Sequence, residues 1–241
     1  MPEQKKRKKN RNYCHRCACD PHCSEHCKNC ENCNVCDCDQ CLFEVAKNNF
    51  WVMYPIHTKP TFVRNERTQQ EHRTKALKYV TSWNNCIDIG SHVGMWTREL
   101  ATRFKKVYCF EPNPIFIECF NKNITENNVE LFQYGLSNME HKASTNKQST
   151  MLKDTDGEVV CKTLDSFNLK NIDFIKIDVD GFEYKVLHGA MKTIRNNSPT
   201  INIELKRDKR KNTVQKCRKL LGKLGYKYAK RTRHDEIWLK K

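Results

Sequence analysis

Residues 86–96 read CIDIGSHVGMW, a short apolar run that ends at two glycines and is followed by a helical pattern. The run from Cys86 to Ile89 is typical of a strand buried inside a sheet. Gly90 permits a turn conformation that other residues rarely adopt, and Gly94 lets backbone approach a ligand closely. The following helix would direct its N-terminal N–H groups at that ligand, which favours an anionic group. The stretch therefore predicts a ligand-binding loop at the end of a strand.

The spacing of this loop narrows the class of ligand. Asp88, Gly90 and Gly94 spell D-x-G-x-x-x-G, whereas a dinucleotide site has G-x-G-x-x-G and a P-loop has a lysine. Glu111 ends the next predicted strand, 21 residues after Gly90, where an acid can accept hydrogen bonds from ribose hydroxyls. A nucleoside ligand is therefore indicated, and the missing pyrophosphate motif favours S-adenosylmethionine over NAD. A generic strand–turn–helix with a solvated acid is the alternative.

Strands and helices alternate from residue 84 onward. Strands are expected at 86–89, 107–111, 129–134, 173–179 and 200–205, and helices at 95–104, 114–123, 182–195 and 212–224. Smaller features are a polar hairpin or loop at 138–160, a helical turn at 163–167, and a closing antiparallel hairpin at 226–229 and 236–239. Such alternation predicts an α/β fold with a mostly parallel sheet covered on both faces.

Acidic side chains follow the fourth of these strands, in IDVDGFE. Asp178 and Asp180 are two residues apart and point to the same face if the strand continues, while Glu183 opens the next helix. Asp178 is the main candidate for orienting an acceptor hydroxyl or removing its proton. Asp180, Glu183 and His92 are secondary catalytic candidates. Asp180 can instead cap the helix, and His92 can instead cap a helix or contact the cofactor.

Several segments together resemble one known family. CIDIGSHVGMWT, VYCFEPNP, YGLSN and TLDSFNLKNIDFIKIDVDGFEYKVLHGA, followed by INIEL, are similar to the FkbM family of S-adenosylmethionine-dependent methyltransferases. The resemblance covers about residues 84–240. It implies a Rossmann-like methyltransferase sheet of seven strands with the last antiparallel. It also implies mostly O-methylation of a hydroxyl of a sugar or another small molecule.

The resemblance also assigns roles to single positions. Asp88, Gly90 and Gly94 would border the methionine part of the cofactor, Glu111 would hold its ribose, and Asp178 would face the reaction centre. The complete set of cofactor-binding candidates is Asp88, Gly90, Ser91, Gly94, Glu111, Pro112, Gly135, Leu136 and Ser137, the last three near adenine. The chain departs from the family at His92, where Asn is frequent, and at Asp180, where Glu or Gln is common. Both departures leave the substrate open.

The N-terminal third divides by composition into three regions. Residues 1–12 are a basic tail expected to be disordered alone, and 13–41 are rich in cysteine and almost empty of large aliphatic residues. Residues 42–83 form a connecting region with a strand at 50–54 and a polar helix at 66–82, before the methyltransferase-like domain at 84–241. The start lacks an apolar signal segment, and no apolar run approaches the roughly 18 residues of a membrane span. We therefore expect a reducing, cytoplasmic location.

Ten of the fifteen cysteines lie in the region 13–41. In a reducing compartment such a cluster favours metal over disulfides, and two tetrahedral Zn²⁺ sites would supply the folding free energy that the region lacks. Disulfides, an unstructured segment and an iron–sulfur cluster remain alternatives. The predicted metal ligands are Cys14, Cys17, Cys19, Cys23, Cys27, Cys30, Cys33, Cys36, Cys38 and Cys41. The other five cysteines, Cys86, Cys109, Cys119, Cys161 and Cys217, are expected to be small core residues.

The chain carries 44 Lys and Arg against 28 Asp and Glu, a net charge of +16. From Lys206 to Lys241 there are 15 basic residues and three acids, so a nucleic acid or another polyanion is a candidate partner for this region and the basic tail. A solvated basic surface is the alternative. Two further functions stay open: an RNA 2′-O-methyltransferase, and a metal-clustered RNA-binding protein with an inactive methyltransferase fold.

Overall fold

The computed structural model divides the chain into two compact units, Met1–Asn65 and Glu66–Lys241. In the first unit, strand β1 (Phe43–Val45) pairs antiparallel with β2 (Trp51–Met53). The cysteine-rich region 13–41 lies outside the described residues, so its predicted metal sites stay predictions. The structure describes residues 43–45, 51–53, 69–145, 152–153, 155, 157–206 and 211–241.

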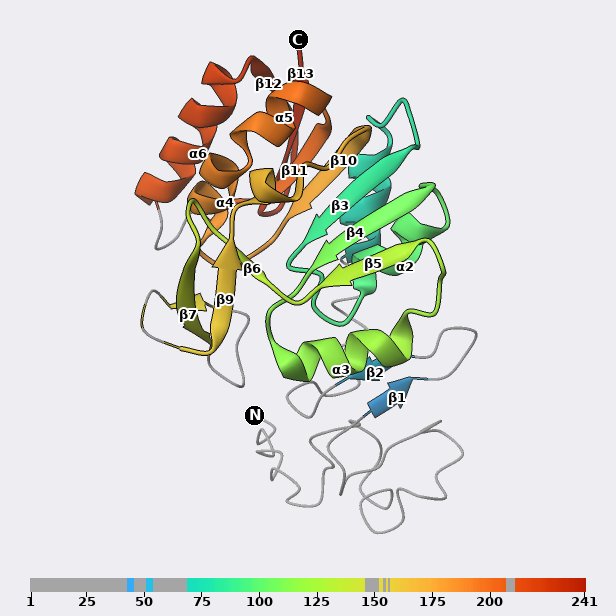
Figure 1. Cartoon of the computed structure of the whole chain (residues 1–241). Coiled ribbons are helices and arrows are strands. Elements are labelled where there is room, and N and C mark those ends of the chain that lie inside the picture. The colour runs from blue at the N-terminus through green and yellow to red at the C-terminus, as the bar shows by residue number, and fades with distance from the viewer. Residues whose placement is uncertain are drawn as a thin grey trace, which may run out of the picture. The chain divides into compact units, whose positions relative to one another are not determined.

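A seven-stranded mixed sheet forms the centre of the second unit (Figure 1). Its order is β12 (Tyr226–Thr232), β13 (Asp235–Lys240), β11 (Thr200–Glu204), β10 (Ile172–Ile177), β3 (Asn85–Ile89), β4 (Lys106–Phe110) and β5 (Val129–Phe132). Strands β11 to β5 are parallel, and β13 runs antiparallel to both of its neighbours. The predicted seven-stranded α/β fold with an antiparallel last strand is therefore confirmed.

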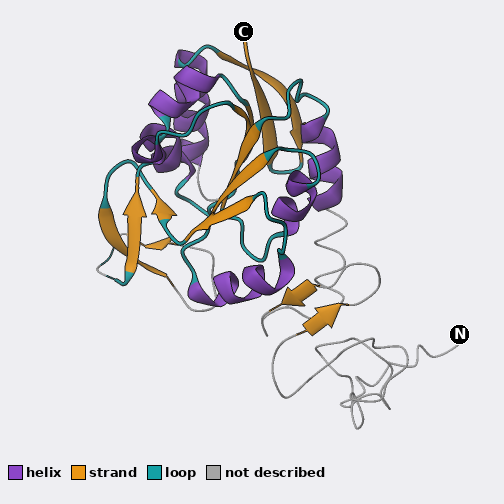
Figure 2. Cartoon of the chain, turned by 45° about the vertical axis from the view of Figure 1, so that its right-hand side comes forward, coloured by secondary structure: helices purple, strands orange, loops and turns teal. Residues whose placement is uncertain are grey.

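Helices cover both faces of this sheet (Figure 2). One core cluster includes side chains of α4 (Glu183–Gly189), α5 (Met191–Asn197) and α6 (Lys211–Lys223), and the other includes those of α2 (Met95–Ala101), α3 (Pro114–Asn123) and the helix at 69–77. The inner strands are almost wholly buried, as expected for parallel strands between two helical layers.

The helix expected at 182–195 is two helices, α4 and α5, which meet at Ala190. The carboxylate of Asp165 accepts hydrogen bonds from the backbone N–H groups of Lys192 and Thr193 and from the Thr193 hydroxyl. It therefore caps a new helix start, as an acid does at an N-terminus. A side chain on Gly189 would place Cβ 2.0 Å from the carbonyl oxygen of Ser137, so the chain passes tightly here.

A small second sheet takes strands from the segment 138–160, where a polar hairpin or loop was expected. Its order is β6 (Gly135–Leu136), β9 (Val159–Lys162), β7 (His141–Thr145) and β8 (Leu152–Lys153), and β7 and β8 pair antiparallel. These strands have only two to five residues each, too few for an alternating pattern to mark them in the sequence. The 3-10 helix η3 (Leu164–Phe167) follows β9, as predicted for 163–167. Strand β6 places Gly135 and Leu136 beside the carboxyl ends of β3 and β4.

Candidate cofactor and catalytic site

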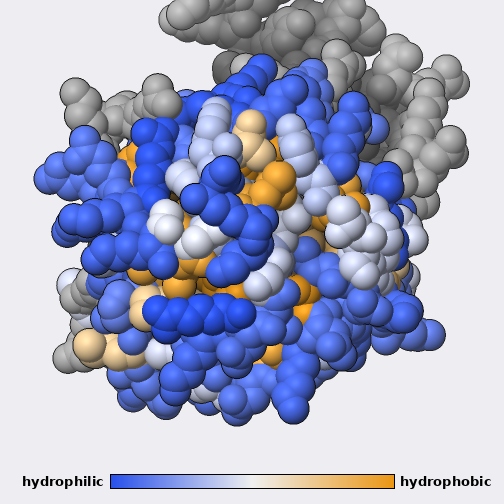
Figure 3. All heavy atoms as spheres, turned by 90° about the horizontal axis from the view of Figure 1, so that it is seen from above, coloured by the Kyte–Doolittle hydropathy of each residue, from blue (hydrophilic) through white to orange (hydrophobic). Residues whose placement is uncertain are grey.

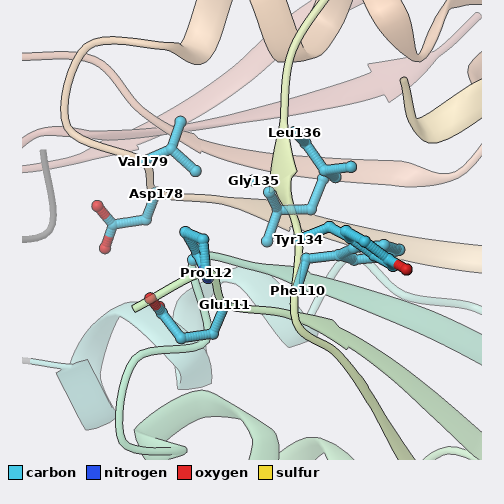
Figure 4. Close-up of a pocket in the computed structure, with 10 residues that line it drawn as sticks. Phe110, Glu111, Pro112, Tyr134, Gly135, Leu136, Asp178 and Val179 are labelled. Atoms are coloured by element: carbon cyan, nitrogen blue, oxygen red, sulfur yellow. The ribbon is translucent and has the colours of Figure 1, made fainter. Parts of the chain in front are cut away.

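A pocket lies at the carboxyl ends of β3, β4 and β10, where ligands bind in open α/β sheets. Figure 4 shows Asp178 and Glu111 on one side of the pocket and the Tyr134 ring on the other. Six of its lining residues are predicted site residues: Gly90, Glu111, Pro112, Gly135, Leu136 and Asp178. The other four are Ile89, Phe110, Tyr134 and Val179.

The two loop positions Gly90 and Gly94 require glycine for different structural reasons. Gly90 has φ +74°, and a Cβ there would lie 1.9 Å from the carbonyl oxygen of Asp178. Only glycine therefore lets the loop pass this close to the backbone of Asp178, which follows β10 at the pocket wall. Gly94 has φ +94°, and its Cβ would meet the Ile124 side chain at 2.7 Å. Gly94 thus allows close packing against Ile124 at the end of α3, and its predicted approach to the ligand stays a prediction.

A buried ion pair between Asp88 and Lys176 holds the Gly90 loop in place. Asp88 is fully buried, accepts a hydrogen bond from the Thr97 hydroxyl at 2.7 Å, and lies 3.1 Å from the ammonium nitrogen of Lys176. Lys176 also donates to the carbonyl oxygen of Gly90 at 2.7 Å. Burial alone would lower the pKa of Lys176, but the carboxylates of Asp88 and Asp178 outweigh it and raise that pKa.

Lys176 was missed as a functional candidate, and Asp88 lies beneath the loop rather than on the pocket wall. A signal for Lys176 was present, because a lysine inside an apolar strand such as DFIKIDV is almost never buried without a charged partner. The same pair explains why the apolar strand β3 contains the acid Asp88. Its carboxylate neutralises the lysine that holds the loop.

Glu111 is a buried carboxyl group that two backbone N–H groups hold in place. It is 3% exposed, and its two carboxylate oxygens accept hydrogen bonds from the backbone N–H groups of His92 and Asn113, each at 2.9 Å. Burial raises the pKa of Glu111 to about 7, against the lowering effect of these two bonds. A carboxylate can accept about four hydrogen bonds in total, so capacity remains for two ribose hydroxyls.

Two polar atoms near Glu111 also lack protein partners. The Ser91 hydroxyl and the Asn113 side-chain nitrogen are buried without a hydrogen bond. Buried polar groups normally find a partner, so a polar ligand at this loop would satisfy them. Together with the cradle at Gly90, these orphaned atoms fit the nucleoside part of S-adenosylmethionine.

Asp178 forms a carboxyl pair with a residue of the next strand. Glu204 ends β11 beside it, and the two side chains lie within hydrogen-bonding reach of each other. Burial raises the pKa of Asp178 against the lowering effect of the Lys176 charge. Burial and the nearby charge of Asp178 together raise the pKa of Glu204 to about 8. A carboxyl group with a pKa of about 8 is mostly protonated at neutral pH, so Glu204 can donate a hydrogen bond to Asp178.

Lys206 forms ion pairs with Glu204 and with Asp180. Its ammonium nitrogen lies 2.7 Å from an oxygen of Glu204 and 2.7 Å from one of Asp180. Burial lowers the pKa of Lys206, but the two carboxylates outweigh it and raise that pKa. Glu204 was absent from the predicted site residues, although INIEL at a strand's carboxyl end carries an acid in the right place.

The remaining predicted residues lie around the pocket rather than on its wall. Asp180 has φ +47° and pairs with Lys206. Glu183 is buried in the first turn of α4 and accepts a hydrogen bond from the backbone N–H of Gly181. The His92 ring packs against Phe116 with centroids 4.0 Å apart. Ser137 is buried, and its backbone N–H bonds to Lys162 in β9.

The structure holds no alternative metal centre within its described part: no three His, Cys, Asp or Glu side chains gather there to bind an ion. No described helix is long and apolar enough to cross a membrane. Five cysteines of the second unit are buried and form no disulfide, which confirms that they are core residues: Cys86, Cys109, Cys119, Cys161 and Cys217.

Solved structures resemble this chain at low identity. A methyltransferase FkbM from Methylobacillus flagellatus KT is 16% identical with a TM-score of 0.49, over 65% of this chain and 44% of that one. An rRNA methylase from Streptococcus thermophilus is 13% identical with a TM-score of 0.48, over 73% and 96%. Magnesium protoporphyrin IX methyltransferase from Synechocystis, solved with bound S-adenosylmethionine, is 14% identical with a TM-score of 0.45, over 74% and 82%. Similarity at this level does not bear on substrate.

The family comparison is more decisive. A search of curated proteins found no match. A family model described as the methyltransferase FkbM domain matches residues 88–228, which contain every residue of the pocket wall. This match supports S-adenosylmethionine as the cofactor of the site. It spans more than half of the chain, and the chain therefore belongs to the family of FkbM methyltransferase domains.

Proposed function

We propose that the chain is an S-adenosylmethionine-dependent O-methyltransferase acting on a hydroxyl of a sugar or another small molecule. The observation that carries this proposal is the position of Asp178. Its carboxyl lines the same pocket as Glu111 and lies within hydrogen-bonding reach of Glu204, so one cavity contains a group suited to a ribose and a group suited to a hydroxyl proton.

The cofactor half of the pocket would use three elements. Glu111, after β4, would accept hydrogen bonds from the ribose hydroxyls, and the Ser91 hydroxyl would bond to a polar group of the ligand. Gly135 and Leu136 on β6 line the wall beside the Tyr134 ring, which suits the flat apolar faces of adenine. When bound, the cofactor would supply an electrophilic methyl group on a sulfonium.

The catalytic half would work by alignment and proton removal. Asp178 would accept the hydrogen bond of the acceptor hydroxyl and take its proton as the new carbon–oxygen bond forms. The protonated carboxyl of Glu204 would donate a hydrogen bond to the ionised Asp178 and keep that side chain oriented. Lys176 and Lys206 flank the pair, and their positive charges limit the cost of burying a carboxylate.

Asp178→Asn tests the proposal, with Glu118→Gln on the exposed face of α3 as the matched charge-removal control. Purified full-length protein would be incubated with labelled methyl donor and pooled monosaccharides, glycosides and hydroxylated metabolites. We expect label transfer with wild-type and control protein, and loss of transfer with cofactor binding retained in Asp178→Asn. Transfer that is undiminished in Asp178→Asn would remove this residue from the chemistry.

An RNA 2′-O-methyltransferase is the second candidate. The specific observation in its favour is the basic surface of α6 and β12, on which no acid of those elements is exposed. The same labelling experiment distinguishes the two candidates when RNA is included as an acceptor. Label recovered in RNA and absent from the small-molecule pools would establish this second candidate.

A further inference from the structure

The C-terminal elements α6, β12 and β13 present only positive charge to solvent. Residues 211–241 contain eleven Lys and Arg and two acids, Asp235 and Glu236. Both acids are buried, at 6% and 0% exposure. Asp235 pairs with His72, and Glu236 pairs with both Arg218 and Arg231. Two guanidinium groups on one buried carboxylate leave a surplus positive charge, and the exposed lysines add to it.

These charges lie on two adjoining elements. Lys216, Lys219 and Lys223 are exposed and spaced three and four residues apart, so they form one stripe along the solvent side of α6. Helix α6 packs on β12, and Arg218 ties it to β13 through Glu236. We call the exposed side of α6 and β12 the basic face. Hydrophilic residues cover most of the surface in Figure 3, viewed from the end where the C-terminus lies, and hydrophobic residues show between them.

An exposed aromatic ring stands within the basic face. Tyr228 is 51% exposed, and among the described residues only Met139 is another large hydrophobic side chain with such exposure. The Tyr228 ring meets Trp238 edge-on with centroids 5.9 Å apart, which holds its orientation. It lies in β12, the edge strand of the main sheet, with exposed Lys227 and Lys230 on either side.

We propose that the basic face binds single-stranded RNA, with phosphates along the α6 lysine stripe and a base stacked on Tyr228. Lysines that follow a phosphate backbone and an aromatic ring for an unstacked base are the two parts of a single-strand binding surface. A duplex keeps its bases stacked and offers no base to the ring. An anionic membrane would favour an apolar stripe for insertion, and the exposed positions of α6 are polar.

One end of the basic face lies beside the candidate site. The turn between β12 and β13 is hydrogen-bonded to the residue that follows β11: the backbone N–H of Leu205 donates to the carbonyl oxygen of His234 at 2.7 Å. Arg231 donates to the carbonyl oxygen of Leu205 at 3.3 Å. Leu205 directly follows Glu204, so an RNA strand lying along β12 would lead to the edge of the sheet that carries the carboxyl pair.

Fluorescence anisotropy with a labelled 12-nucleotide RNA lacking secondary structure tests the proposal on the full-length protein, without cofactor. The test variant is Lys216→Glu/Lys219→Glu/Lys223→Glu. The matched control is Lys78→Glu/Lys122→Glu/Lys170→Glu, which changes the net charge equally at exposed lysines on other elements. Both variants would first be checked for a wild-type thermal unfolding midpoint.

We expect the basic-face variant to bind at least about tenfold more weakly at low salt, with a salt slope reduced by about 2, because three phosphate contacts are lost. Tyr228→Ala should weaken binding roughly tenfold with little change in the salt slope, because stacking is not ionic. Equal weakening in the basic-face and control variants would overturn the proposal, since net charge alone would then explain binding. Equal or tighter binding of duplex RNA or anionic vesicles, lost in the same variants, would also overturn it. The assay needs no methyl transfer, so its result is independent of the proposed activity.

Discussion

Glu111→Gln gives the sharpest prediction about the cofactor half of the site. In the wild-type protein, burial raises the pKa of Glu111 to about 7. Ribose hydroxyls donate to the ionised carboxylate, so ligand binding requires the proton to leave. Affinity should therefore be constant above about pH 8 and fall as the pH drops through 7, with about tenfold weaker binding at pH 6 than at pH 8.

The substitution removes both the charge and its titration. Hydrogen bonds to a charged group contribute about 1.5–3 kcal/mol, so Glu111→Gln should bind about 10- to 150-fold more weakly at pH 8. Its affinity should then be nearly flat between pH 6 and 8. Part of the loss can come from the loop itself, because the carboxylate also accepts the backbone N–H groups of His92 and Asn113.

Isothermal titration with 5′-methylthioadenosine suits this test, because that ligand keeps the ribose and lacks the amino acid group that would titrate. Glu118→Gln on exposed α3 is the control and should retain both affinity and pH dependence. Thermal unfolding without ligand adds a second readout with a defined sign. A raised carboxyl pKa makes the folded state hold a proton that the unfolded state releases, so the stability contributed by Glu111 falls as the pH rises from about 4.5 to 7. Equal affinities and equal pH profiles for wild type and Glu111→Gln would refute the assignment.

Three further predictions concern the neighbouring groups and the N-terminal region. Glu204→Gln should keep the orienting hydrogen bond to Asp178 but abolish the transition near pH 8 in the pH profile of methyl transfer; a retained transition would assign it to another group. Lys176→Met should lower the free energy of unfolding in urea by about 3–5 kcal/mol, because Asp88 is left buried and unpaired; a change below about 1 kcal/mol would contradict the ion pair's role. Elemental analysis of the metal-loaded full-length protein should find about two zinc ions per chain, released on cysteine alkylation; zinc content that is unaffected by substituting the cysteines of 13–41 would rule out this region as the site.

The strands and the loop at Gly90 could be predicted because their signals are local. Apolar runs that end in Asp or Glu mark the carboxyl edge of a parallel sheet, and Asp178 and Glu111 follow directly from that edge. The break between α4 and α5 could not be predicted, since it depends on Asp165, which is distant in the sequence and caps α5. The roles of Lys176 and Glu204 depend on which strands are neighbours, and the chain order of strands does not state that.

The same distinction applies to Asp88 and Gly94. Their spacing matched a ligand loop, but burial and close contacts show that one neutralises a lysine and the other makes room for Ile124. The motif predicts where a ligand loop lies. The contacts from β10 and α3 show what Asp88 and Gly94 pack against, and which members of the motif face a ligand stays a prediction.

Equilibrium binding of S-adenosylmethionine to the full-length protein tests the central claim most directly. We predict saturable binding of one molecule per chain in wild type and in Asp178→Asn, and strongly reduced binding in Glu111→Gln. No saturable binding to a folded wild-type protein would contradict the assignment of this pocket to the cofactor.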